Sequence, residues 1–194
     1  ALAALLVGAA ALAQTAPLTS ATAADFERQL ELGDGSMTKG FRPTAPPDPE
    51  HRCEARAKEA DGPGSKTLEV VYADESAPRS QMGLRFGFNS DALTPDDRRM
   101  LDQLSLALNG SKLKGGRFAI AGHTDVTGDA TAAGADNNRR LSCARALRVV
   151  EYLVDRGRVA RDRLTAYGFG SEKLLAGFAP TSAMHRRVEI RRAD

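Results

Sequence analysis

Hydrophobic and polar positions alternate in five short runs, and this pattern predicts β-strands. The runs are TLEVVY (67–72), MGLRFGF (82–88), GGRFAIAG (115–122), RLTAYGFG (163–170) and RRVEIRR (186–192). The second run places Leu84, Phe86 and Phe88 on one face. In the last run Val188 and Ile190 alternate with charged residues, so we expect the apolar pair to face inward and the charges outward.

A helix is predicted between the second and third runs. Thr94 is a good N-cap, Pro95 suits the first helical position, and two aspartates favour the first turn. The apolar stripe that follows is Met100, Leu101, Leu104 and Leu108. Gly110 then ends the helix.

A second helix is predicted over RRLSCARALRVVEYLVDR (139–156), capped by Asn137 or Asn138 and closed by Gly157. Its apolar stripe is Cys143, Ala146, Leu147, Val150, Leu153 and Val154. From the run MGLRFGF onward, the order along the chain is strand, helix, strand, helix, strand, strand. One sheet face covered by two helices predicts an α+β fold, a two-layer α/β sandwich, over residues 67–194.

The chain before this domain has a different composition. Residues 1–13, ALAALLVGAAALA, are typical of the apolar core and small-residue cleavage site of a secretory signal peptide, with a buried helix or short anchor as the alternative. Residues 14–66 contain FRPTAPPDPEHR and EADGPGSK, which favour a flexible spacer. Within it, ADFERQLEL (24–32) favours a short helix. We therefore expect an exported protein with no transmembrane helix.

Charge is spread unevenly along the 194 residues, whose net charge is +2. Residues 1–138 carry 14 Lys/Arg and 19 Asp/Glu, whereas residues 139–194 carry 13 and 6. The basic C-terminal part is compatible with an anionic wall polymer, a lipid head group or nucleic acid, and also with an ordinary Arg-rich surface. Export counts against nucleic acid, and the aromatic residues of this part form no evident stacking platform.

The two cysteines, Cys53 and Cys143, permit a disulfide in an oxidising compartment. As an alternative, Cys143 packs as a small hydrophobic residue in its helix. Neither cysteine has metal-ligand spacing to another ligand, and no nucleophile with a base is evident. His123, Asp125 and His185 lie on separate elements without supporting spacing, so we expect no metal, no cofactor and no enzymatic activity.

Polar residues gather where the predicted elements end. Thr124 and Asp125 follow the FAIAG strand, while Arg145 lies two turns into the second helix. The other members of this set are Asn89, Asn138, Arg186 and Arg187. An Asp facing an Arg is complementary to a zwitterion, because the carboxylate takes an ammonium group and the guanidinium grips a carboxylate. An Asp125–Arg145 salt bridge, or a turn capped by Asp125, explains the same spacing.

The segments GHTDVTG, NRRLSCARALRVVEYL, LTAYGFG and HRRVEI, in this order, resemble the C-terminal domain of outer-membrane protein A and its relatives. Among these relatives are the peptidoglycan-associated lipoprotein and the wall-binding part of the flagellar stator. The resemblance covers roughly residues 67–192. It implies a β-α-β-α-β-β domain with a mixed sheet, located in the periplasm or at the outer membrane.

The resemblance also implies a ligand and its site. The ligand is peptidoglycan, bound non-covalently through the diaminopimelate of the stem peptide and clamped by Asp125 and Arg145. The other pocket residues that it implies are Thr124, Asn138, Asn89 and Arg187. An interaction scaffold for envelope proteins, with the same fold and no wall binding, is the alternative function.

The chain departs from the family pattern at two places. Residues 129–137 make the connection before Asn138 several residues longer than usual, and their Ala/Gly/Asp-rich composition favours a flexible lip beside the pocket. His185 stands where the family usually has Asn before RRVE. An imidazole there would make ligand binding dependent on pH near neutrality.

Overall fold

The structure, a computed structural model, describes residues 20–31, 51–53, 79–84, 86 and 89–193. The predicted signal peptide (1–13) and the predicted strand 67–72 lie outside the described residues. The same holds for most of the predicted spacer.

The described elements are α1 (Ala23–Leu30), β1 (Arg79–Met82), α2 (Pro95–Asn109), β2 (Phe118–Gly122), α3 (Ala132–Asp155), the 3-10 turn η2 (Arg161–Arg163), β3 (Leu164–Gly168), the 3-10 turn η3 (Ala183–His185) and β4 (Val188–Arg192). Their sheet has the order β1-β4-β2-β3. β4 is antiparallel to both β1 and β2, whereas β2 and β3 are parallel. The predicted two-layer α+β fold with a mixed sheet is confirmed.

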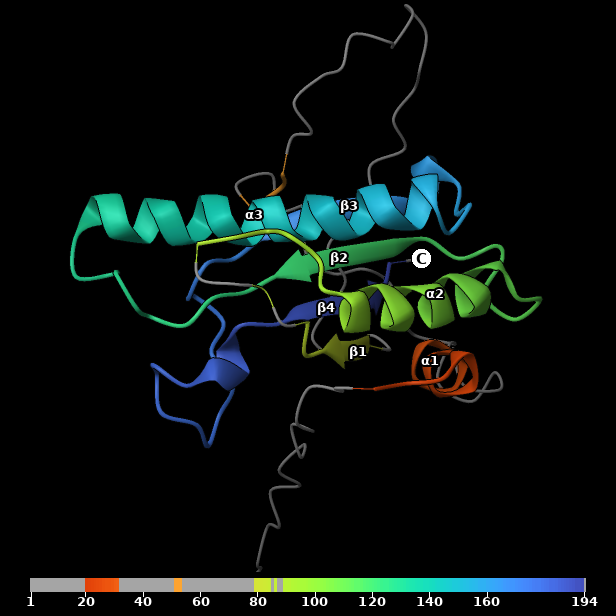
Figure 1. Cartoon of the computed structure of the whole chain (residues 1–194), viewed down its shortest axis with the longest axis horizontal. Helices are drawn as coiled ribbons and strands as arrows, with labels where there is room; N and C mark the ends of the chain where they lie inside the picture. The colour runs from red at the N-terminus through yellow and green to blue at the C-terminus, as the bar shows by residue number, and fades with distance from the viewer. Residues whose placement is uncertain (1–19, 32–50, 54–78, 85, 87–88, 194) are drawn as a thin grey trace, which may run out of the picture.

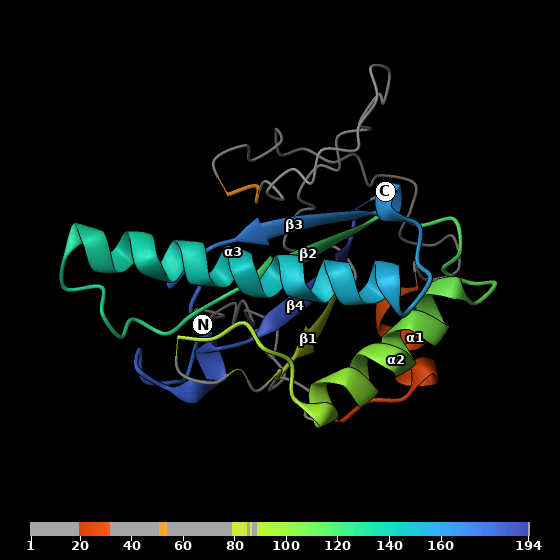
Figure 2. The same cartoon turned by 45° about the horizontal axis from the view of Figure 1, so that its top comes forward.

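Helices α2 and α3 cover one face of the sheet, and α1 lies beside α2 (Figures 1 and 2). The core fills the space between these layers. Its fully buried side chains include Leu101, Leu104, Leu108, Phe118, Ile120, Val149, Leu153, Val188 and Ile190. The apolar stripes that predicted the helices therefore meet the inward positions of the strands.

The first strand lies nearer the N-terminus than predicted. β1 ends at Met82, where the run MGLRFGF begins. Its partner explains the shift: Met82 pairs with Val188, the first residue of β4, so the residues after Met82 have no strand to continue the ladder. Leu84 is buried and Phe86 packs against the core without belonging to a strand. Phe88 lies outside the described residues.

The start of α2 is confirmed. The Thr94 hydroxyl accepts a hydrogen bond from the Asp97 N–H at 3.2 Å, and Asp97 in turn accepts one from the Thr94 N–H at 2.9 Å. This reciprocal capping box satisfies two of the N–H groups that a helix start leaves unpaired. Gly110 follows the last helical residue, as predicted.

The start of α3 differs from the prediction, and the predicted flexible lip is wrong. The helix begins at Ala132, six residues before Asn138, with Thr131 as its N-cap. The Thr131 hydroxyl accepts a hydrogen bond from the Gly134 N–H at 3.1 Å. Most of the insertion 129–137 therefore forms the first turns of α3, since alanine is the strongest helix former. Asn138 lies inside the helix and does not cap it.

The alternation in β4 is confirmed, but its charges are not exposed. Glu189 and Arg191 lie on the face of the sheet opposite the helices. Both are nevertheless buried, with 1% and 3% of their surface exposed. Glu189 accepts hydrogen bonds from Arg187 at 2.6 Å and from Arg191 at 2.8 Å. Burial is tolerated because the charges are paired and hydrogen-bonded to one another.

Two pieces of the predicted spacer pack against the domain. In α1, which confirms the predicted short helix, Phe26 and Leu30 are fully buried. Residues 51–53 run along the free edge of β3, where the Gly168 N–H donates to the His51 carbonyl at 2.9 Å. Cys53 and Cys143 form a disulfide, with their Cα atoms 5.5 Å apart. This bond links the edge segment to α3.

Candidate functional site

The parallel strands β2 and β3 end side by side, and the loops that follow them are hydrogen-bonded together. The Phe169 N–H donates to the Gly122 carbonyl at 3.1 Å, and the Thr124 N–H donates to the Gly170 carbonyl at 2.7 Å. These bonds hold Thr124 and Asp125 at the carboxyl edge of the sheet. Polar groups that follow parallel strands commonly form ligand sites at this edge.

Two glycines let α3 approach this edge closely. A Cβ atom on Gly122 would lie 2.1 Å from the Ser142 carbonyl oxygen, and one on Gly168 would lie 2.5 Å from the Cys143 sulfur. The Ser142 hydroxyl also accepts a hydrogen bond from the Gly170 N–H at 2.9 Å. The helix that carries Arg145 therefore packs directly against both strand ends and is hydrogen-bonded to the loop after β3.

Asp125 is 5% exposed and is held from two sides. One carboxylate oxygen accepts from the Thr127 N–H at 2.8 Å, and the other accepts from Arg186 at 2.6 Å. Burial raises the pKa of Asp125. The hydrogen bonds from Thr127 and Arg186 and the charge of Arg186 lower it, and together they outweigh the effect of burial. The net pKa lies below the ordinary value, so the group is an anion at neutral pH.

Arg145 is 2% exposed, and its guanidinium lies against the loop that precedes α2. Its Nε donates to the Ser90 carbonyl at 3.1 Å, and the group stacks over the Phe86 ring at 5.0 Å from the centroid. Burial and the charge of Arg186 lower the pKa of Arg145 to about 10, whereas Asp125 and Asp91 raise it. Asp125 therefore lies within electrostatic range of two guanidinium groups and contacts one of them.

The other predicted residues differ in position. The Thr124 hydroxyl is buried and has no hydrogen-bond partner among the described residues. Asn138 donates to the Thr127 carbonyl at 3.0 Å and to the Asp129 carboxylate at 2.7 Å, so it holds the loop that presents Asp125. Asn89 is exposed, has a positive φ of 48°, and precedes Ser90.

Arg187 lies away from Asp125. It is 3% exposed, and its guanidinium is bonded to Glu189 and to the Lys173 carbonyl. Its neighbour Arg186 contacts Asp125 instead. The signal was present in the sequence, because residues alternate between faces on entering β4. Arg186 is two residues before Val188, which faces the helices, so the two belong to the same face. Arg187 is two residues before Glu189 and belongs to the opposite face.

His123 packs beneath the loop with no exposed surface. Its ring stacks on Phe169, with centroids 5.6 Å apart, and Nε2 lies 3.7 Å from the Glu189 carboxylate. Burial and the charges of Arg187, Arg191 and Lys173 lower its pKa to about 3, although Glu189 acts in the opposite direction. The imidazole is therefore neutral at pH 7 and supports the strand end by stacking.

Glu189 is the anion of this buried cluster. Burial raises the pKa of Glu189, whereas His123, Arg187 and Arg191 lower it to about 2. Because His123 is neutral at pH 7, the two arginines are the cations that keep Glu189 ionised. Arg187 is thus engaged in a structural ion pair on the face of the sheet opposite α3.

His185 fastens the loop between β3 and β4. Its Nδ1 accepts from the Leu175 N–H at 3.1 Å, and Nε2 donates to the Ala179 carbonyl at 2.8 Å. Both ring nitrogens are used within this loop, with the side chain fully buried. The pH-dependent ligand contact that the sequence indicated for His185 stays a prediction.

Within the described part of the chain, no three His, Cys, Asp or Glu side chains lie close enough together to hold a metal ion. The described helices also include none with the length and apolar character needed to cross a membrane.

Comparison with known proteins agrees with this geometry. The model of the OmpA family matches residues 85–187. Outer membrane protein A of Shimwellia blattae is 36% identical over 105 residues, which are 54% of this chain and 41% of that protein. Outer membrane protein A of Serratia odorifera is 39% identical over 85 residues, 43% of this chain and 32% of that protein. The matched part of the chain thus spans less than half the length of these two relatives.

Solved structures show the same fold. The OmpA-like domain of FopA1 from Francisella tularensis superimposes with a TM-score of 0.52 at 16% identity, covering 79% of this chain and 96% of that domain. A MotB-like protein from Desulfovibrio vulgaris gives 0.50 at 26% identity, covering 61% and 74%. Because the family match spans more than half of the chain and includes the candidate site, the chain belongs to the OmpA family.

Proposed function

We propose that this protein binds peptidoglycan non-covalently through the diaminopimelate of the stem peptide and so links an exported protein to the bacterial cell wall. It acts as a binding module rather than an enzyme, in the periplasm or at the outer membrane. Membership of the OmpA family supports the wall association. The observation that carries the proposal is a sheltered carboxylate, Asp125, between the guanidinium groups of Arg145 and Arg186.

This arrangement matches the free end of diaminopimelate, which carries an ammonium and a carboxylate on one carbon. Asp125 would accept the ammonium, and a guanidinium would grip the carboxylate through its planar fork. The hydroxyl of Thr124, buried beside Asp125, supplies a further hydrogen-bonding group. Asn138 would act indirectly by holding the loop, and exposed Asn89 would border the entrance.

Arg186 has a particular role in this proposal. In the structure it occupies the place on Asp125 that the ammonium of the ligand would take. Its side chain is 44% exposed, so Arg186 can turn toward solvent, and the ammonium of the ligand would replace its charge beside Asp125. The ligand would therefore displace Arg186 at little cost, and the freed guanidinium would meet the carboxylate of the ligand. Arg187, bound to Glu189, would stay in place.

Sedimentation with purified peptidoglycan sacculi tests the proposal. The wild-type chain should co-sediment, while Asp125→Ala, Arg145→Ala and Arg186→Ala should each weaken binding about tenfold or more. Lys112→Ala is the control, because Lys112 pairs with Glu31 at the far end of α2 and is about half exposed. Circular dichroism should show that each variant is folded.

Two outcomes would contradict the proposal. If the wild-type chain stays in the supernatant, the wall-binding function is wrong, and a scaffold for envelope proteins takes its place. If all variants sediment as well as the wild type, the chain binds the wall by another surface.

A further inference from the structure

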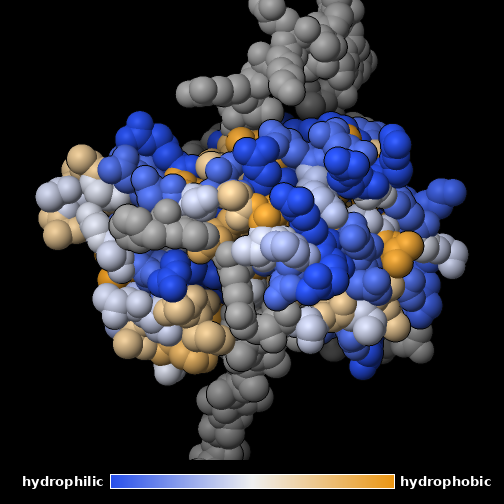
Figure 3. Space-filling model, viewed as in Figure 1, coloured by the Kyte–Doolittle hydropathy of each residue, from blue (hydrophilic) through white to orange (hydrophobic). Residues whose placement is uncertain are grey.

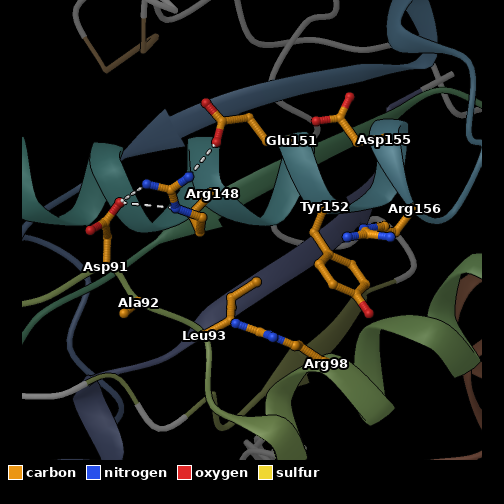
Figure 4. Close-up of a pocket in the computed structure, with 9 residues that line it drawn as sticks. All are labelled: Asp91, Ala92, Leu93, Arg98, Arg148, Glu151, Tyr152, Asp155 and Arg156. Carbon is orange, nitrogen blue, oxygen red and sulfur yellow. Dashed lines mark hydrogen bonds and ion pairs between the residues drawn. The ribbon is translucent and has the colours of Figure 1, made fainter.

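A groove of about 420 Å³ lies between α2 and α3, beside the candidate site. Figure 4 shows side chains from both helices and from the loop before α2 around it. Arg98 comes from α2, Arg148, Glu151 and Tyr152 come from α3, and Arg156 lies at the end of α3. We call it the α2–α3 groove.

The groove and the candidate site share one wall, the loop at residues 90–93. The Ser90 carbonyl accepts from Arg145 on the side of the candidate site. The next residue, Asp91, accepts from Nε and Nη2 of Arg148 at 3.1 and 2.9 Å on the groove side. Arg145 and Arg148 are three residues apart on α3, which is about 4.5 Å along the helix axis. The groove is therefore within reach of a polymer held at the candidate site.

Charges in the groove are balanced in number, and Arg148 is held in place by two of the acidic residues. The lining contains three arginines and three acidic residues. Arg148 is held by Asp91 and also by Glu151 at 2.8 Å (Figure 4). Such a surface offers hydrogen-bond donors and acceptors without a net charge. Its net charge does not favour an anion, because the lining has as many carboxylates as guanidinium groups.

Tyr152 adds an aromatic ring to this polar lining. Its hydroxyl donates to Asp102 at 2.8 Å, which orients the ring. Burial and Asp102 raise the pKa of Tyr152, whereas Arg98 and Arg156 lower it, so both guanidinium groups lie within electrostatic range of the hydroxyl. Leu93 contributes an aliphatic wall. The groove thus combines an apolar ring face with donors and acceptors on either side of it.

This combination fits a neutral polyhydroxylated ligand. Sugar hydroxyls both donate and accept hydrogen bonds, and the C–H face of a sugar ring packs on an aromatic side chain. The described residues on the face that carries the helices are mainly hydrophilic, with only small apolar areas (Figure 3), which favours a sugar over an apolar protein partner.

We propose that the α2–α3 groove binds the glycan strand of the polymer whose stem peptide enters the candidate site. This inference rests on the proposed function for the identity of the polymer. The sugar-binding property itself depends only on the groove. An N-acetylated glycan whose lactyl groups are amide-linked to stem peptides is uncharged along its backbone, which matches the charge balance of the groove.

Nuclear magnetic resonance titration of the full chain with the neutral tetramer of N-acetylglucosamine tests the inference. Amide signals of residues 91–93 and 148–156 should shift. The double variant Arg98→Ala/Arg156→Ala should bind at least about fivefold more weakly. The control Arg99→Ala, an exposed neighbour on α2 paired with Asp96, should bind like the wild type. Asp125→Ala should also bind the tetramer like the wild type.

The inference is overturned if the tetramer shifts no groove signals, or if Arg99→Ala and the double variant lose binding equally. It is also overturned if a hyaluronan tetrasaccharide, which carries carboxylates, binds at least about fivefold more tightly than the neutral tetramer, because the groove would then be an anion site. Failure of the proposed function looks different. The tetramer would still bind in the groove, while stem peptides containing diaminopimelate would not bind at the candidate site.

Discussion

At the scale of single residues, the site depends on keeping a few charges ionised and one imidazole neutral. Asp125 stays anionic because Thr127 and Arg186 bind its two oxygens. Directly before Thr124, His123 is buried in neutral form against Phe169. The strand end that presents the ligand-binding groups is therefore supported by a group that resists protonation.

This support predicts a pH dependence of stability. The pKa of His123 is lowered from 6.5 to about 3 in the folded protein. As the pH falls from 6.5, the unfolded chain takes up a proton that the folded protein does not, so the free energy of unfolding should fall. The contribution of this group is roughly 1.4 kcal/mol per pH unit. His123→Leu should flatten the curve by that amount between pH 6.5 and 5 in urea unfolding.

Phe169→Leu is the control for this experiment, because it removes the stacked neighbour and no titratable group. It should lower stability at every pH without changing the slope. An unchanged slope in His123→Leu would show that folding does not lower the pKa of the imidazole.

Residue patterns predicted part of the candidate site. A polar pair after an apolar strand placed Asp125 at the sheet edge, and the helical position of Arg145 placed it across from that edge. The sequence prediction named Arg187, whereas Arg186 contacts Asp125. Choosing Arg186 would have required applying the alternation of faces in β4 to the two residues before Val188. Ser90 could not be predicted, because its backbone carbonyl, and not its side chain, contacts Arg145.

At the scale of elements, the site depends on how closely α3 lies on the ends of β2 and β3. The glycines that permit this approach look like ordinary turn residues in the sequence. The start of α2 could be predicted because its capping signals, Thr94 and Pro95, are local. The start of α3 could not, because two asparagines competed with Thr131 as the cap, and the Ala/Gly-rich stretch between them is compatible with either helix or loop.

Gly122→Ala should destabilise the fold and disturb the site. The added methyl group would lie 2.1 Å from the Ser142 carbonyl oxygen, so α3 must move away. Overpacking of this kind costs about 1–3 kcal/mol, which chemical denaturation would measure. Gly115→Ala is the control, since a Cβ there meets nothing within 4 Å, and it should change stability by less than about 1 kcal/mol. Equal stability of the two variants would contradict the close approach.

At the scale of the whole molecule, segments far apart in the sequence close around the sheet. Helix α1 packs beside α2, and residues 51–53 extend the sheet along the free edge of β3. The sequence indicated a flexible spacer here because a Pro-rich stretch lies between these segments and a stretch with glycines and a proline follows Cys53. The buried residues Phe26, Leu30 and Cys53 are too few to outweigh that composition in a local analysis, although they supply the tertiary contacts.

The disulfide should stabilise the whole fold. Cys53 and Cys143 are 90 residues apart, so the bond removes much conformational freedom from the unfolded chain. Reduction, or the double variant Cys53→Ser/Cys143→Ser, should lower the free energy of unfolding by about 2–4 kcal/mol. Denaturation with and without a reductant measures this change, and the double variant should not respond to the reductant. A reductant effect of equal size in the double variant would contradict the assignment.

The most direct test of the central claim is isothermal titration calorimetry with two stem tripeptides. One carries diaminopimelate, and the other carries lysine, which lacks the second carboxylate. If Asp125 and the neighbouring arginines form a zwitterion site, the diaminopimelate peptide should bind at least about tenfold more tightly than the lysine peptide. Arg186→Ala should abolish that preference, because the freed guanidinium meets the second carboxylate, whereas Asp125→Asn should weaken the binding of both peptides. Equal affinity of the wild type for the two peptides, or an unchanged preference in Arg186→Ala, would contradict the account.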